Sequence, residues 1–137
     1  MYGQKFEITF DKEALKRFFK NDTNVICAII FGSSQNGVIG KDSDLDIAVL
    51  FHKQPKGKEK LNYYSKICDI DRNIERIDFV VLNTANEILA FEALKGEYLC
   101  KNDIEKTAEY FSLVCREYED VMANIEYQYS LREEKQQ

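Results

Sequence analysis

The sequence predicts a single α/β (α+β) domain in which helices flank a small β-sheet and a long helix ends the chain. Three apolar runs have the length of strands, and helical patterns lie between and after them. These runs are Val25–Phe31, Leu45–Phe51 and Ile77–Leu82. At 137 residues the chain is long enough for one hydrophobic core and too short for a second substrate-binding domain, so residues 1–137 are expected to form one domain.

The N-terminal segment predicts a short strand followed by a helix. Phe6, Ile8 and Phe10 alternate with polar residues, which favours an edge strand or an extended lead-in. Asp11 is a good N-cap for a helix that runs to about Asn21 with an apolar stripe on one side.

The first long apolar run is predicted to be a central strand. Val25–Phe31 shows no alternation of apolar and polar residues, as expected when both faces of a strand are covered. Ser33 or Ser34 can then cap a short helix ending near Gly37, whose free N–H groups would attract an anion. Residues 40–43 are expected to be loop.

The second half of the chain continues with the remaining two strands and their helices. After Leu45–Phe51, residues 58–71 are predicted to be helical, and residues 77–82 form the third strand. Thr84 with Glu87 predicts a capping box for a helix that ends before Gly96, where a left-handed residue is natural.

A long C-terminal helix is predicted from a second capping box. Asn102 and Glu105 open it, it spans about residues 103–132, and residues 133–137 form a frayed tail. Two interpretations of its apolar seam stay open: the outer end packs on another chain, or the helix lies across its own sheet. The seam contains Ile104, Ala108, Phe111, Cys115, Tyr118, Met122, Ile125 and Tyr129.

Aspartates at the starts of two predicted strands are the candidate catalytic and metal-binding residues. Side chains alternate along a strand, so Asp44 and Asp46 project from one face. Two carboxylates about 4 Å apart repel by about 4 kcal/mol at an effective dielectric of 20, which favours a cation between them. If the third strand lies beside the second, Asp78 completes a three-carboxylate cluster; the alternative is an edge-strand aspartate that faces solvent.

The spacing of these residues resembles a known family signature. Gly32-Ser33, ten further residues and then Asp44-Leu45-Asp46 are similar to the G-S-x(10)-D-x-D motif of the DNA polymerase beta-like nucleotidyltransferase superfamily. The likeness is strongest to its minimal nucleotidyltransferases, because residues 77–103 also resemble their second half. The resemblance implies the nucleotidyltransferase fold, a small mixed sheet flanked by helices. The alternative is an ordinary turn followed by a strand that starts with aspartates.

The resemblance also implies roles for individual residues. The matching aspartate pair, Asp44 and Asp46, would bind metal. Asp78 would deprotonate or orient the acceptor hydroxyl and complete the metal site. Mg²⁺, as two ions, would be the cofactor and ATP the substrate.

Phosphate binding would fall to the residues around the Gly-Ser turn. Gly32 and Ser33 would hold the terminal phosphates, with Ser34 at the start of the short helix. Many relatives carry a basic residue soon after the serine, whereas Ser34, Gln35 and Asn36 follow Ser33 here, so Lys41 is the candidate for phosphate charge.

Composition narrows the partners and the compartment. The net charge of −5 disfavours binding to long nucleic acid, and no apolar run approaches the roughly twenty residues of a membrane span. The N-terminus lacks the apolar core of a signal peptide, and the four cysteines are far apart, without a C-x-x-C pair. These features predict a cytoplasmic protein with reduced thiols.

Within the superfamily, this short chain most resembles the MntA-like antitoxins of HEPN/MNT toxin–antitoxin systems, because it has no room for a further domain. The resemblance implies transfer of AMP from ATP to a tyrosine hydroxyl of a cognate HEPN ribonuclease toxin, which would neutralise the toxin. Two alternatives stay open: a small-molecule (aminoglycoside-type) nucleotidyltransferase, and a non-catalytic antitoxin that acts by binding alone. The C-terminal helix is the candidate surface for a homo- or hetero-oligomer.

Overall fold

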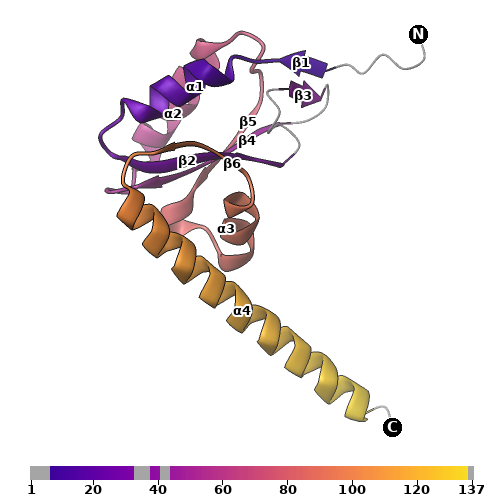
Figure 1. The fold of residues 1–137 in the computed structure, drawn as a ribbon. Helices are drawn as coiled ribbons and strands as arrows, with labels where there is room; N and C mark the ends of the chain where they lie inside the picture. The colour runs from indigo at the N-terminus through magenta and orange to yellow at the C-terminus, as the bar shows by residue number, and fades with distance from the viewer. Residues whose placement is uncertain (1–6, 33–37, 41–43, 136–137) are drawn as a thin grey trace, which may run out of the picture.

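The computed structural model describes residues 7–32, 38–40 and 44–135 and contains a mixed sheet with helices on both faces (Figure 1). The sheet has four strands in the order β5-β4-β2-β6, and a separate two-stranded sheet pairs β1 with β3. The strands are β1 Glu7–Thr9, β2 Val25–Phe31, β3 Val38–Gly40, β4 Leu45–Phe51, β5 Ile77–Val81 and β6 Glu97–Lys101. The helices are α1 Lys12–Lys20, α2 Gly57–Ile70, α3 Glu87–Leu94 and α4 Ile104–Lys135, with a 3₁₀ turn at Leu82–Thr84.

Strand β2 is the centre of the sheet, as its apolar sequence predicts. All seven of its residues are buried, and it pairs antiparallel with both β4 and β6. Strand β5 pairs parallel with β4, so β5 and β6 are the two edge strands of the sheet. The fold is therefore the small mixed sheet, flanked by helices and followed by a long C-terminal helix, that the sequence predicts.

Alternate residues of β2 belong to two separate hydrophobic clusters. Ala28 and Ile30 pack with residues of α1 and α2, whereas Ile29 and Phe31 pack with residues of α3 and α4. A nonpolar residue at every position of this strand thus serves both layers of helices.

Two strands were not predicted from the sequence. Residues 38–40 form β3, where Gly40 was expected to be loop, because their backbone pairs with β1. Strand β6 was also missed; it directly follows Gly96 and pairs with β2. Gly96 does not adopt the predicted left-handed conformation; among the described glycines, Gly32 is the one with a positive φ. A Cβ at Gly96 would instead collide with the carbonyl oxygen of Ile30.

The N-caps of two helices also differ from the predicted capping boxes. Asn86, not Thr84, caps α3, and its side chain accepts a hydrogen bond from the N–H of Leu89. Asp103, not Asn102, accepts from the first turn of α4, while the Asn102 amide donates to main-chain oxygens near the end of α1. In both cases the side chain one or two residues nearer the helix has the favourable geometry.

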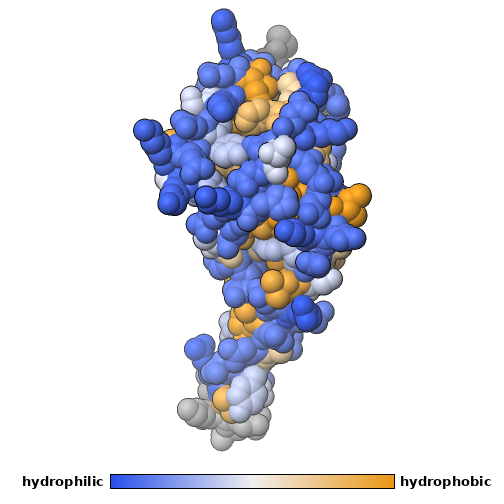
Figure 2. Space-filling model, turned by 90° about the vertical axis from the view of Figure 1, so that its left-hand side faces the viewer, coloured by the Kyte–Doolittle hydropathy of each residue, from blue (hydrophilic) through white to orange (hydrophobic). Residues whose placement is uncertain are grey.

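Helix α4 extends well beyond the sheet (Figure 1). Its 32 residues correspond to a length of about 48 Å. Val114 is buried against the sheet layer, and Tyr118 stacks on Phe91 of α3 with 3.8 Å between ring centroids. Farther along, Ile125 and Tyr129 are exposed. Figure 2 shows hydrophobic residues among polar ones along this protruding part. No helix in the described chain is both long enough and apolar enough to cross a membrane.

Candidate functional site

The sequence-predicted aspartates lie where β2 ends and where β4 and β5 begin. We call this end of the strands the aspartate edge. Asp46, near the start of β4, lies opposite Phe31 of β2 on one side and opposite Asp78 of β5 on the other. Asp44 precedes β4 by one residue. Because Phe31 packs with the α3 and α4 cluster, Asp46 and Asp78 project from that face of the sheet.

Gly32 brings the end of β2 against Asp46. It adopts a φ of +71°, a left-handed conformation that L side chains rarely take. A Cβ at this position would lie 2.5 Å from Oδ2 of Asp46. The backbone conformation therefore favours glycine at this turn, and an added Cβ would displace the Asp46 carboxylate.

The carboxylates at this edge influence one another electrostatically. Burial raises the pKa of Asp46, and the negative charges of Asp78 and Asp44 raise it further. Asp78 is exposed on the edge strand β5. It therefore has both features that the sequence left open, a position beside Asp46 and access to solvent.

Arg76 is a charged residue of this edge that sequence reasoning did not identify. Its Nε lies 3.5 Å from Oδ1 of Asp44, and both side chains are about half exposed. Its carbonyl oxygen accepts a hydrogen bond from the N–H of Leu45 at 3.0 Å, which continues the pairing of β4 and β5. The available signal was its position two residues before Asp78, which places both on one face of an extended chain.

The donor chemistry of this edge suits a hard divalent cation, but the observed arrangement does not enclose one. Carboxylate oxygens are the ligands that Mg²⁺ prefers. Among the residues that the structure describes, however, no three His, Cys, Asp or Glu side chains converge to hold a metal ion. Asp44 is instead paired with Arg76.

Three predicted phosphate-binding residues cannot be placed at this edge. Ser33, Ser34 and Lys41 lie outside the described residues, as does the predicted short helix. Gly32 is therefore the one member of the predicted nucleotide-binding set with a described position.

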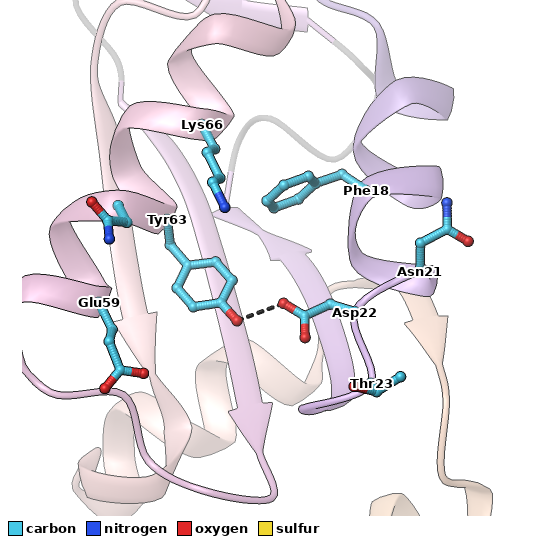
Figure 3. Close-up of a pocket in the computed structure, with 8 residues that line it drawn as sticks. Phe18, Asn21, Asp22, Thr23, Glu59, Tyr63 and Lys66 are labelled. Carbon is cyan, nitrogen blue, oxygen red and sulfur yellow. Dashed lines mark hydrogen bonds between the residues drawn. The ribbon is translucent and has the colours of Figure 1, made fainter.

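A cavity lies near the opposite end of β2, between α1 and α2 (Figure 3). It has a volume of about 490 Å³, and none of the sequence-predicted site residues lines it. Tyr63 donates a hydrogen bond to Asp22 there. The pKa of Tyr63 is raised mainly by burial and further by this hydrogen bond. The lining residues are Phe18, Asn21, Asp22, Thr23, Glu59, Asn62, Tyr63 and Lys66. This cavity is distinct from the aspartate edge.

A nucleotidyltransferase family model matches more than half of the chain. Residues 13–105 match the family model described as polymerase beta, nucleotidyltransferase. A search of curated protein sequences returned no match.

Solved structures share the fold at low sequence identity. A chain of a toxin–antitoxin crystal structure with AMP-PNP is 17% identical with a TM-score of 0.72, over 88% of this chain and 97% of that one. A chain of a mutant of the toxin–antitoxin MntA-HpeT is 15% identical with a TM-score of 0.72, over 88% of this chain and 97% of that one. A chain of the tri-AMPylated Shewanella oneidensis HEPN toxin in complex with MNT antitoxin is 16% identical with a TM-score of 0.64, over 86% and 93%.

Proposed function

Because the chain belongs to the polymerase beta nucleotidyltransferase family, we propose that it transfers AMP from ATP to a hydroxyl group of a protein partner. The observation that carries this proposal is the position of Asp46, between the Gly32 turn and Asp78. Gly32 and Asp46 belong to the G-S-x(10)-D-x-D signature, and Asp78 adds a third carboxylate on the neighbouring strand.

Each residue of the motif has a separate role in the proposed reaction. Gly32, with Ser33, holds the terminal phosphates, and the acceptor oxygen attacks the α-phosphorus in line with the departing pyrophosphate. A new oxygen–phosphorus bond forms as the bond to the β-phosphate breaks. Asp78, exposed beside Asp46, orients the acceptor hydroxyl and takes its proton. Asp44 and Asp46 would hold Mg²⁺, which when bound stabilises charge on the phosphates.

We further propose that the acceptor is a tyrosine of a cognate HEPN ribonuclease toxin, so that the protein acts as an antitoxin. Support comes from the shared fold with chains of toxin–antitoxin structures, one with AMP-PNP and one with a tri-AMPylated HEPN toxin. The exposed outer part of α4, with Ile125 and Tyr129, offers a surface for that partner. The four free cysteines fit a reducing, cytoplasmic compartment.

The test is transfer of label from ATP carrying a radioactive α-phosphate, with Mg²⁺, to the protein encoded next to this one. Wild type is compared with an Asp44→Asn, Asp46→Asn double variant. Asp69→Asn is the matched control, because Asp69 is an exposed aspartate on α2, on the other face of the sheet. We expect label on a tyrosine of the partner with wild type and the control, and none with the double variant.

Other results would redirect the assignment. Equal labelling by the double variant would refute a role for these carboxylates. A stable complex without any label would favour an antitoxin that acts by binding alone. Labelling of an aminoglycoside without a protein partner would favour small-molecule modification.

A further inference from the structure

The pairing of Arg76 with Asp44 places a positive charge inside the carboxylate edge itself. In the parallel register Leu45 lies opposite Ile77 and Asp46 opposite Asp78. One residue earlier on each strand, Asp44 and Arg76 continue the same alignment, and their side chains meet at 3.5 Å. The β4–β5 register thus holds Arg76 beside Asp44, one of the two aspartates between which the sequence predicts a cation.

The like charges at this edge favour a positive charge beside them. Burial, and then the negative charges of Asp78 and Asp44, disfavours ionisation of Asp46. The Arg76 guanidinium lies beside Asp44 and stays charged at any pH at which the protein folds.

The contact is of a kind that another cation can replace. The nearest atoms, Nε of Arg76 and Oδ1 of Asp44, are 3.5 Å apart, and 58% of the Arg76 side chain and 49% of the Asp44 side chain are exposed. Half-exposed ion pairs contribute little, because water and salt screen them. The arginine can therefore turn to solvent without opening a buried gap.

Building on the proposed function, we propose that Arg76 is a resident counterion of Asp44 that a divalent cation must displace before the aspartates can bind it together. In the arrangement that the structure describes, Asp44 pairs with Arg76, and no three metal-ligating side chains among the described residues converge. Arg76 acts through Asp44 and is a positioning residue.

Binding of Mn²⁺ alone, measured from the electron paramagnetic resonance signal of the free ion, tests this without any transfer reaction. Arg76→Gln should bind Mn²⁺ roughly threefold to tenfold more tightly than wild type, because one positive charge near a divalent ion is removed. Arg76→Lys keeps the charge and should stay near wild type. Arg72→Gln is the matched control, since Arg72 is an exposed arginine of the same connection, and it should bind as wild type.

Either of two Mn²⁺-binding results would overturn the inference, and the first separates it from the proposed function. If wild type binds Mn²⁺ and Arg76→Gln binds it equally or more weakly, Arg76 is no competitor, while the proposed transferase is unaffected. If neither wild type nor any variant binds Mn²⁺, both proposals fail. A melting temperature that Mn²⁺ raises more for Arg76→Gln than for wild type is the expected second readout; an equal rise contradicts competition.

Discussion

Replacing Gly32 by alanine should separate the folding of this protein from its chemistry. The new methyl group would lie 2.5 Å from Oδ2 of Asp46, and ordinary contact begins at 3.4 Å, so the carboxylate must retreat by about 0.9 Å. The Asp46 side chain can rotate to do this. The backbone cannot relax as easily, because a non-glycine residue at a φ of +71° costs about 1–2 kcal/mol.

Stability should therefore fall by about 1–2 kcal/mol, while transfer of AMP should fall by about a hundredfold, since displacing a reacting group by about 1 Å has that effect. Urea unfolding gives the first quantity, and the initial rate of label transfer gives the second. Gly57→Ala is the matched control, because no atom lies within 4 Å of its added Cβ and its φ is not positive. Unimpaired transfer by a folded Gly32→Ala protein would refute the role assigned to this contact.

Three further changes test the surroundings of the site. The raised pKa of Asp46 means that its negative charge opposes folding, a penalty absent below the unfolded pKa of about 3.9 and growing as pH rises through the folded pKa. Asp46→Asn should hence stabilise the metal-free protein by about 1 kcal/mol at pH 7 in urea unfolding, with no gain near pH 4; a gain independent of pH would contradict this cause. Tyr63→Phe removes the hydrogen bond to Asp22 and should cost about 1–2 kcal/mol in urea unfolding with unchanged transfer activity, so a loss of transfer would implicate the cavity in catalysis. The double change Ile125→Ser, Tyr129→Ser should leave stability within about 0.5 kcal/mol but weaken the partner complex at least about tenfold by calorimetry; unchanged affinity would exclude this surface.

The sequence predicts those elements whose own residues determine their structure. The apolar run of β2 indicates a strand covered on both faces, and the structure confirms this. Strand β6 is less regular, with Leu99 as its one buried residue, and it is a strand because β2 offers it a backbone partner. Strand β3 likewise exists through its pairing with β1. Pairing between distant segments leaves little trace in a local pattern.

The same distinction applies to the candidate site. Alternation along β4 identifies Asp44 and Asp46 as neighbours, and the polar residue in an apolar strand identifies Asp78. The partner of Arg76 depends on the register between β4 and β5, which no single strand specifies. The collision that requires Gly96 depends in the same way on how closely β6 approaches β2.

The ring stack of Phe91 and Tyr118 joins α4 to α3 near the middle of α4. From Tyr118 to Lys135 the helix extends by about 25 Å. A tilt of about 10° at the stack therefore displaces the outer end by about 4 Å. Conversely, a partner bound to the outer end would act on α3 through this stack. Helix α3 packs against β2, the strand that leads into Gly32. Small angular adjustments at two aromatic rings thus become movements of atomic size where another protein would bind.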